Sequence, residues 1–385
     1  MRISALTIVL GLLFCAAPAA AQFPFYVATP AQISGAPGSV IRSEPMDIQP
    51  AGAAATRVLY RSTGLNGEPI AVSGVVIVPQ GPAPAGGWPV IAWAHPTSGV
   101  IPRCAPSLAN FLYDQIQGLQ AMIHQGYIVV ATDYPGLGTP QTHPYLVGIS
   151  EGRAVLDSVR AARALVPNAQ NRFAVWGHSQ GGQASIYTGL LAQNYAPDLQ
   201  LVGVAAAAPA TDLAALFSDD INTNGGRNIA AMTLWSWSRI YDAPMDNVVY
   251  ASAVPTVNAL SQECIESVYD VIARHFTQRG LQQRFLSVDD ITSVEPWRAL
   301  MAKNSPGAPD PSIPVFLAQG SADQVVRPTV TEGYMGALCK AGSRVKFVWL
   351  PGVTHLSVAR KSADAFVAWA GDRFAGRPAP SDCGS

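Results

Sequence analysis

The chain has 385 residues, of which 49% are hydrophobic and 13% charged, with 34 glycines, 31 prolines and a formal net charge of −1. The high apolar content excludes a highly charged disordered chain. The lack of a basic excess argues against a general nucleic-acid-binding protein, because such proteins need positive charge to meet phosphates. The chain is long enough for one large α/β domain with an insertion, or for two domains.

The first 21 residues are predicted to be a signal peptide. Arg2 carries a positive charge, residues 3–15 are almost wholly apolar, and Ala19 to Ala21 form a small-residue cleavage site, so the mature chain is expected to begin near Gln22. The apolar run falls short of the roughly 20 residues that span a bilayer, which disfavours a membrane anchor. We therefore expect a secreted or periplasmic protein.

A hairpin and a series of buried strands are predicted next. The hairpin spans 57–79, where two β-branched runs flank Asn66-Gly67, a strong turn dipeptide. Short apolar runs without alternation follow, which indicates strands buried on both faces, as in a parallel sheet. These runs occupy residues 88–94, 127–133, 172–177, 201–208, 314–320 and 345–351.

Helical patterns separate most of these strands. They occupy residues 109–125, 150–166, 181–195, 329–340 and 362–374. Strands that alternate with helices predict βα units and a mostly parallel, doubly wound α/β sheet.

The alternation fails once, within 211–311. This segment is too long for a loop and lacks the signature of a buried strand. We expect a mostly helical cap, or lid, inserted into an α/β core that comprises 22–210 and 312–385. The helix-like pieces of the cap occupy residues 228–241, 256–279 and 281–287.

The sequence Gly-His-Ser-Gln-Gly at 177–181 places Ser179 between a predicted strand and a predicted helix. The pentapeptide alone is a weak signal in a glycine-rich chain, but its context is that of a nucleophile elbow. Such a turn exposes the serine Oγ at the carboxyl edge of the sheet, and the backbone N–H of Gln180 can donate to an oxyanion. Ser179 is therefore the predicted nucleophile.

A serine hydroxyl needs a base, and His355 is the predicted one. It follows the last predicted strand, at the same edge of the sheet as the elbow. Asp323 follows a strand between Ser179 and His355, so it is the predicted acid that orients the imidazole, and the order Ser, acid, His is that of α/β-hydrolases. Asp133 also follows a strand but precedes the serine, so we interpret it as an aspartate that organises a loop.

The loop at 94–99 is expected to supply a second oxyanion donor, because it follows the strand at 88–94. Pro96 has no N–H, so the donor is Thr97 or its neighbour Ser98, and we favour Thr97. The alternative is that this segment is simply a turn.

Aromatic residues of the cap allow two interpretations. The side chains of Trp235, Trp237 and Tyr241 could line a tunnel for an acyl chain, or they could form the core of the cap, since aromatic residues serve both roles.

Four cysteines follow the signal peptide: Cys104, Cys264, Cys339 and Cys383. An even number in an exported chain indicates two disulfides, and four cysteines allow three pairings. The sequence has no C-x-x-C motif and no histidine cluster with zinc spacing, so no metal is expected. The glycines at 136 and 138 lack the full dinucleotide-binding pattern.

The combination of motifs resembles the secretory lipase family of α/β-hydrolases, which includes fungal lipase A enzymes and exported bacterial relatives. The resemblance covers most of the mature chain. Bacterial members commonly have His-Gly in the oxyanion loop, where this chain has His95-Pro96. The segments that carry the resemblance are 92–107, 133–145, 152–165, 177–182, 319–326 and 352–355.

The resemblance implies a carboxylic ester hydrolase, a lipase or esterase, that needs no cofactor and has a helical cap over its acyl site. It also implies one disulfide between Cys104 and Cys264, joining the oxyanion-loop region to the cap, and one between Cys339 and Cys383. We expect a monomer that acts on small-molecule or lipid esters, the latter at a lipid–water interface. A serine peptidase or amidase is the main alternative, because the same triad serves both on this sheet. Acyl transfer to alcohols and a non-catalytic binding protein are further alternatives, and the complete triad disfavours the last.

Overall fold

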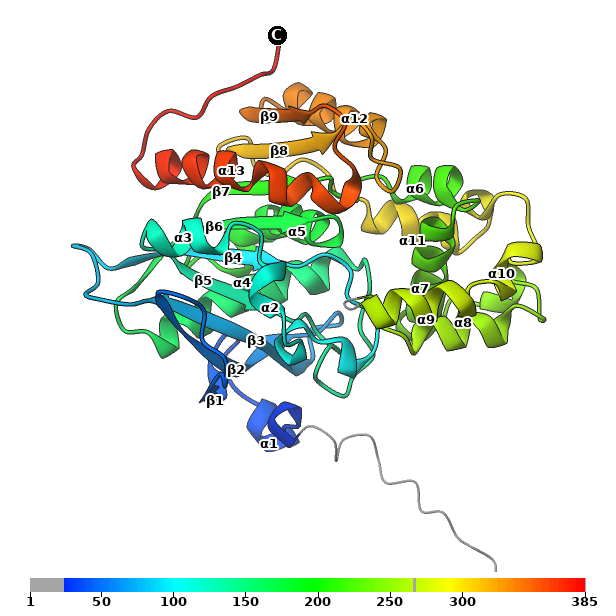
Figure 1. Cartoon of the computed structure of the whole chain (residues 1–385), viewed down its shortest axis with the longest axis horizontal. Coiled ribbons are helices and arrows are strands. Elements are labelled where there is room, and N and C mark those ends of the chain that lie inside the picture. The colour runs from blue at the N-terminus through cyan, green and yellow to red at the C-terminus, as the bar shows by residue number, and fades with distance from the viewer. Residues whose placement is uncertain (1–23, 266–267, 385) are drawn as a thin grey trace, which may run out of the picture.

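The computed structural model describes residues 24–265 and 268–384, so the signal peptide predicted at 1–21 lies outside the described residues. Within them the strands form one sheet in the order β1-β2-β3-β5-β4-β6-β7-β8-β9 (Figure 1). The strands are β1 (Val40–Pro45), β2 (Ala53–Thr63), β3 (Pro69–Pro79), β4 (Trp88–Ala94), β5 (Ile128–Thr132), β6 (Ala169–His178), β7 (Gln200–Ala207), β8 (Val315–Gly320) and β9 (Val345–Leu350).

The sheet combines an antiparallel edge with a parallel body. The predicted hairpin is β2 and β3, which pair with Thr63 opposite Pro69, and β3 joins β5 antiparallel. From β5 onward all neighbours are parallel. Every residue of β5 and β8 is buried, as expected for strands that are covered on both faces. The prediction of a mostly parallel sheet is confirmed, whereas β1, a half-buried edge strand without an apolar run, was not predicted.

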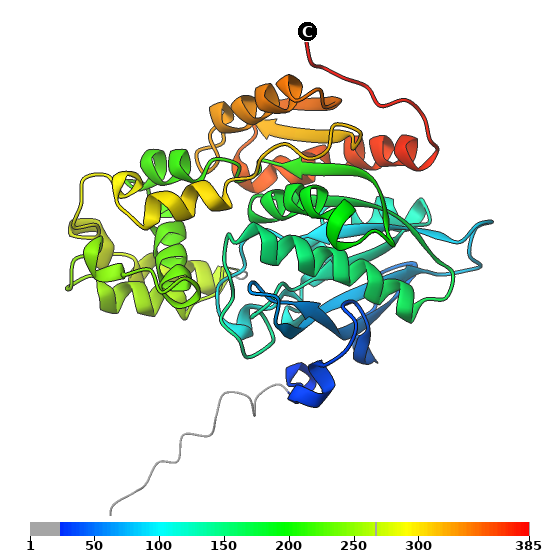
Figure 2. The same ribbon diagram turned by 180° about the vertical axis from the view of Figure 1, so that it is seen from behind.

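Helices cover both faces of the sheet, so the sheet is doubly wound (Figures 1 and 2). On one face lie α4 (Gly148–Leu165), α5 (Gln180–Tyr195) and α12 (Pro328–Lys340). The other face carries α3 (Leu119–His124) and α13 (Val358–Phe374), and the ring of Trp176 in β6 stacks on Phe366 of α13 with 4.7 Å between centroids. The short α1 (Pro30–Ile33) precedes β1.

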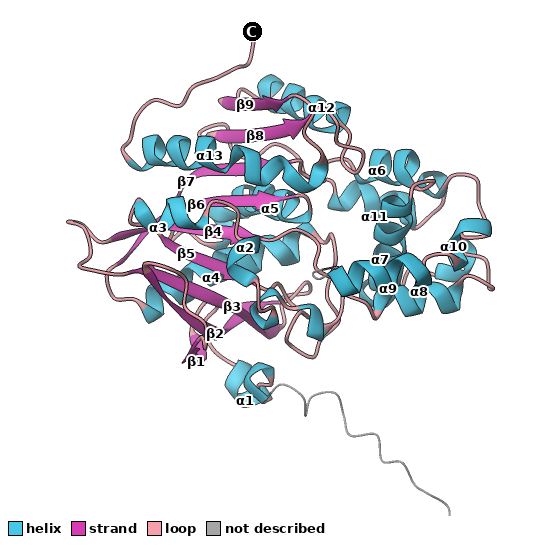
Figure 3. Ribbon diagram, in the orientation of Figure 1, coloured by secondary structure: helices cyan, strands magenta, loops and turns pink. Residues whose placement is uncertain are grey.

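The chain leaves the sheet between β7 and β8, in the region predicted to be a helical cap. The inserted helices lie beyond the carboxyl ends of the parallel strands (Figure 3), and most of them share a hydrophobic cluster that also includes Val100, Tyr145 and Val147 from loops of the sheet domain. The boundaries of the cap at 211 and 311 remain a prediction. The inserted helices are α6 (Leu213–Asp220), α7 (Asn224–Ile240), α8 (Val254–Ser261), α9 (Val268–Thr277), α10 (Gly280–Gln283) and α11 (Trp297–Asn304).

Two helix predictions are wrong in detail. The helix expected over 109–125 is divided into α2 (Leu112–Gln115) and α3, because Gly118 between them has a φ of 87°, in the left-handed region that a helix cannot accommodate. The helix expected over 256–279 is divided into α8 and α9, and Cys264 lies between them, held in a disulfide to a distant part of the chain. Neither interruption is visible in hydrophobic periodicity.

Candidate active site

Ser179 occupies the sharp turn between β6 and α5. Its backbone has φ 58° and ψ −118°, a strained conformation for a residue with a side chain. Glycines make the turn possible: a Cβ at Gly177 would lie 2.0 Å from the carbonyl oxygen of Gly181, and a Cβ at Gly181 would lie 1.9 Å from that of Ala94. The geometry is that of a nucleophile elbow, with the serine 9% exposed.

The structure brings the three predicted triad residues together. The Nε2 atom of His355 lies 2.9 Å from Oγ of Ser179, and its Nδ1 lies 2.8 Å from Oδ2 of Asp323. The other carboxylate oxygen, Oδ1, accepts hydrogen bonds from the backbone N–H groups of Val325 and Val326, each 2.9 Å long. Because the carboxylate is held on both oxygens, it fixes the orientation of the imidazole.

Electrostatics keep the carboxylate of this triad ionised. Burial alone would raise the pKa of Asp323, but the hydrogen bond and charge of His355, together with the N–H groups of Val325 and Val326, hold it below its ordinary value. A second imidazole, that of His178, lies 4.8 Å from the ring of His355. Burial and the charge of His355 lower the pKa of His178 to about 3, so this ring stays neutral.

Both predicted oxyanion donors lie beside Ser179. Thr97 and Gln180 line the same pocket as Ser179, and their backbone N–H groups have no acceptor within the described residues. The Thr97 hydroxyl lies 2.8 Å from the hydroxyl of Tyr145, which holds the loop in place. Ser98 lies one residue further on, where its carbonyl accepts the N–H of Ile265.

Two buried residues that the sequence did not indicate support the side chain of Gln180. Its Nε2 donates to Oε1 of Glu151 over 2.8 Å and lies 3.1 Å from Nε2 of His143. The Nδ1–H of His143 donates to the carbonyl of Pro135, so Nε2 is the free acceptor, and burial lowers its pKa to about 3. Burial raises the pKa of Glu151 to about 8. In the sequence Glu151 is only an acidic residue near a helix start.

Asp133 organises a loop, as its position in the sequence indicated. Its carboxylate accepts hydrogen bonds from Ser73 and from the hydroxyl and backbone N–H of Ser107, at 2.5 to 2.8 Å. It therefore ties β3 and the loop after β4 to the end of β5.

The three aromatic residues weighed as tunnel lining lie instead in the core of the inserted helices. Trp237 is fully buried, stacks on Trp297 and donates its indole N–H to the carbonyl of Tyr145. Trp235 lies under the guanidinium of Arg239, and neither it nor Tyr241 lines the pockets at Ser179. These positions favour the core interpretation over the tunnel interpretation.

Two pockets of different size meet at Ser179. One is narrow, with a cavity volume of about 30 Å³, and its wall is mostly apolar, with Leu146, Phe217 and Ala230. The other has a volume of about 530 Å³, and although polar residues such as Asn228 and Gln278 belong to its lining, most of its wall is apolar as well. Thr97 and Ser179 belong to both. The site therefore offers a narrow and a wide space on either side of the serine.

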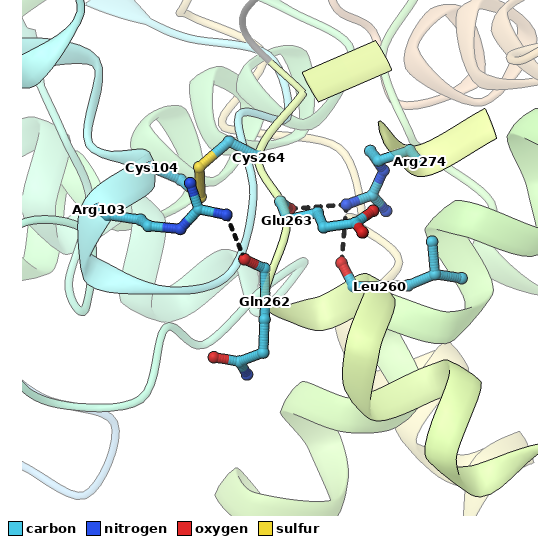
Figure 4. The surroundings of a disulfide bond; sticks show 7 residues. All are labelled: Arg103, Cys104, Leu260, Gln262, Glu263, Cys264 and Arg274. Atoms are coloured by element: carbon cyan, nitrogen blue, oxygen red, sulfur yellow. Dashed lines mark hydrogen bonds between the residues drawn. A yellow bond between two sulfur atoms is a disulfide. The ribbon is translucent and has the colours of Figure 1, made fainter. Parts of the chain in front are cut away.

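Both disulfides implied by the resemblance are present, Cys104–Cys264 and Cys339–Cys383. Figure 4 shows the first, which joins the segment after the oxyanion loop to the inserted helices. A Cβ at Gly99 would lie 2.5 Å from Sγ of Cys104, so this disulfide packs directly against the oxyanion loop.

Residues 24–265 and 268–384 include no group of His, Cys, Asp and Glu side chains arranged to hold a metal ion. In the same part of the chain no helix is both long and apolar enough to cross a membrane.

The fold is that of the α/β-hydrolases, as the sequence predicts. Candida antarctica lipase A in its closed state has this fold with a TM-score of 0.77 and 20% identity, over 96% of this chain and 90% of that one. The model of the secretory lipase family matches residues 112–382, so the chain belongs to this family. It is accordingly a carboxylic ester hydrolase of the lipase and esterase class, as predicted.

Sequence relatives span most of the chain. Lipase A of Moesziomyces aphidis is 27% identical over 369 residues, which cover 87% of this chain and 76% of the relative. A probable inactive lipase of Mycobacterium tuberculosis is 26% identical over 375 residues, covering 92% of this chain and 82% of the relative.

Proposed function

We propose that the protein hydrolyses carboxylic esters through a covalent acyl-enzyme, with Ser179 as nucleophile, His355 as general base and acid, and Asp323 as the orienting carboxylate. The observation that carries the proposal is the continuous contact from Asp323 through His355 to Ser179, at 2.8 and 2.9 Å. One relative is described as a probable inactive lipase, whereas this chain retains all three groups in hydrogen-bonding position.

The first half-reaction forms the acyl-enzyme. Oγ of Ser179 attacks the ester carbonyl carbon while its proton moves to Nε2 of His355. The tetrahedral intermediate then expels the alcohol, which takes that proton from His355. A water molecule next attacks the acyl carbon, His355 accepts its proton, and the proton returns to Oγ as the acid leaves. Asp323 stabilises the imidazolium that forms in each half-reaction.

The backbone N–H groups of Gln180 and Thr97 bind the oxyanion of the intermediate in this proposal. Gln180 is the first residue of α5, where the helix dipole favours negative charge. Its side chain is held by Glu151 and His143, so the N–H is fixed before the substrate arrives. Loss of one such donor costs roughly a hundredfold or more in kcat.

The two pockets receive the two parts of the ester. The leaving alcohol must reach Nε2 of His355, and His355 lines the wide pocket. The carbonyl oxygen must reach the N–H of Gln180, which lines the narrow apolar pocket. We therefore place the acyl group in the narrow pocket and the alcohol in the wide one, which favours short acyl chains.

We further propose that residues 1–21 are removed as a signal peptide and that the mature enzyme works outside the cytoplasm. The chain belongs to a secretory family, and its two disulfides persist in an oxidising compartment.

The test is hydrolysis of p-nitrophenyl esters from acetate to palmitate by the mature chain, by Ser179→Ala and by Ser218→Ala. Ser218 is an exposed serine of α6 and provides the matched control. We expect turnover of the short esters, lost in Ser179→Ala and kept in Ser218→Ala. Turnover that survives in Ser179→Ala contradicts the proposed nucleophile. A folded wild type that hydrolyses peptide or amide substrates but no ester favours the peptidase alternative.

A further inference from the structure

We infer that Glu151 of α4 positions both backbone donors of the oxyanion hole at once, and that it does so as a neutral carboxylic acid. The inference rests on the proposed function, which assigns these donors to Gln180 and Thr97, and goes beyond it by naming the single group that holds the two together. Glu151 lines neither pocket at Ser179, so it is a positioning residue and not a catalytic one.

One carboxyl oxygen of Glu151 joins two segments of the site. Its Oε1 accepts the side-chain Nε2–H of Gln180 over 2.8 Å and the backbone N–H of Leu146 over 3.0 Å. The first contact holds the start of α5, and the second holds the segment between β5 and α4. Glu151 is fully buried, so both hydrogen bonds lie away from bulk solvent.

The contact with Leu146 extends to Thr97 through Tyr145. The Tyr145 hydroxyl lies 2.8 Å from the hydroxyl of Thr97, whose backbone N–H is the proposed second donor. Leu146 has a φ of 55°, in the left-handed region that residues with a large side chain rarely adopt, so this turn needs a partner that fixes it. Among the described residues, the N–H of Leu146 has Glu151 as its only acceptor. Glu151 thereby holds the backbone from which Tyr145 reaches Thr97.

The contact with Gln180 fixes the other donor. The side-chain amide of Gln180 has two hydrogens, and it directs one to Glu151 and the other to Nε2 of His143, 3.1 Å away. The amide cannot turn without losing both contacts, so the first residue of α5 is held in one position. Such precision matters because an oxyanion donor is effective only within hydrogen-bonding distance of the place where the charge develops.

The surroundings of Glu151 supply hydrogen-bond donors but no cation. Its second oxygen, Oε2, is buried without a hydrogen-bond partner, and no ion pair of the described residues includes Glu151. The titratable groups near it are one histidine and four tyrosines: His143, Tyr134, Tyr145, Tyr187 and Tyr241. Burial keeps all five neutral, because it lowers the pKa of His143 to about 3 and raises the pKa of each tyrosine.

The neutral acid suits both the burial and the reaction. A buried carboxylate without a counter-ion is costly, whereas the neutral acid keeps both hydrogen bonds to Oε1 with its proton on Oε2. An ionised Glu151 would place a negative charge behind Gln180, whose N–H meets the negative charge of the intermediate, and like charges repel strongly in a buried site. Burial raises the pKa of Glu151 to about 8, so its ionisation should slow the enzyme above that pH.

The first test compares the pH profiles of wild type and Glu151→Gln, a variant that has the shape of the neutral acid and cannot ionise. At pH 7 we expect their kcat values for p-nitrophenyl butyrate to agree within about threefold, because the amide oxygen accepts the same two N–H groups. Between pH 7 and pH 9 the kcat of Glu151→Gln relative to wild type should rise at least about threefold. A ratio that stays constant over this range overturns the inference.

The second test removes the acceptor. Glu151→Leu should lower kcat at least about tenfold while KM stays within about threefold, because the interaction is made in the transition state. The affinity for a trifluoromethyl ketone, whose adduct with Ser179 carries an oxyanion, should weaken to the same extent as kcat. Wild-type kcat in a folded Glu151→Leu overturns the inference and leaves the ester hydrolase standing. If Glu151→Leu does not fold, the pH comparison decides.

Asp157→Asn is the matched control for both tests. Asp157 is a buried carboxyl of the same helix that bonds Ser62, Arg160 and Tyr195 and lines neither pocket at Ser179. Its replacement should leave kcat within about twofold of wild type, even where the melting temperature falls. An equal loss of kcat in Asp157→Asn and Glu151→Leu overturns the positioning role. A folded wild type that hydrolyses no p-nitrophenyl ester contradicts the proposed function itself.

Discussion

Ser179 and His355 lie 176 residues apart in the chain, yet Oγ of one is 2.9 Å from Nε2 of the other. The strands that precede them, β6 and β9, are not neighbours, because β7 and β8 lie between them in the sheet. Asp323 follows β8, the neighbour of β9 in the sheet, and its carboxylate contacts His355 in the loop after β9. Parallel strands end at one edge of a sheet, so the loops after them converge and bring the three side chains into contact.

Replacing the orienting carboxylate should disable the enzyme without unfolding it. Asp323→Asn keeps the shape of the side chain but holds His355 in the wrong tautomer, so we expect kcat to fall by about 10⁴-fold. The measurement is kcat on a short p-nitrophenyl ester, with circular dichroism as the check on folding. Asp289→Asn, at an exposed position of the inserted region, should retain full activity. A fall of less than about tenfold in Asp323→Asn contradicts the assigned role.

The elbow should tolerate no side chain at Gly181. A Cβ there would lie 1.9 Å from the carbonyl oxygen of Ala94, so Gly181→Ala should lower the free energy of unfolding by about 3 kcal/mol or more. Gly336→Ala is the control, because nothing lies within 4 Å of the added carbon in α12. It should raise stability by up to about 1 kcal/mol. Urea denaturation measures both, and similar stability of the two variants argues against the close approach at the elbow.

The two disulfides should differ in their effect on catalysis. They close segments of 160 and 44 residues, so removal of either should cost roughly 4–5 kcal/mol by loop entropy. Replacing Cys104 and Cys264 by serine should also lower kcat about tenfold or more, because that disulfide packs against the oxyanion loop at Gly99.

The matching double variant of Cys339 and Cys383 serves as the control for this comparison. It should leave kcat within about twofold of wild type, since this pair joins α12 to the C-terminal segment, away from the elbow. The measurements are the melting temperature and kcat of each folded variant below its melting range. Equal losses of kcat in both double variants would show that the loss comes from general destabilisation. They would contradict a specific role of the Cys104–Cys264 disulfide in positioning the oxyanion loop.

Glu151 should make stability depend on pH. Burial raises the pKa of its carboxyl to about 8 from an ordinary value of 4.5, although hydrogen bonds from Gln180 and Leu146 lower it in part. The folded state therefore holds this proton more tightly than the unfolded state. The resulting stability is fully present below 4.5 and is lost as the pH rises through about 8.

Glu151→Gln has the shape of the protonated acid and cannot ionise, so it should escape this loss. We expect its melting temperature to equal that of wild type near pH 5 and to exceed it by at least about 2 °C near pH 9. Glu332→Gln, at an exposed position of α12, should follow wild type at both values. A parallel decline of wild type and Glu151→Gln between these values shows that Glu151 is not the titrating group.

Much of the fold could be predicted because its signals are local. Strands such as β5 and β8 are continuous apolar runs, and α5 and α13 have a helical period, so their order along the chain indicates a doubly wound sheet. Elements without such a signal were missed, among them the edge strand β1 and the helices α6 and α11 of the inserted region. Gly118 and the disulfide at Cys264 ended helices that periodicity alone would continue.

The amino-acid sequence alone identified the residues of the proposed triad, because Ser179, Asp323 and His355 each follow a strand in an order that one edge of a parallel sheet brings together. Only the tertiary structure decided which buried groups surround them. Glu151 lies behind Gln180 and accepts a hydrogen bond from its side chain. Such positions depend on how helices from distant parts of the chain pack. That packing, and not the neighbours in sequence, determines how deeply a side chain is buried and therefore where its pKa lies.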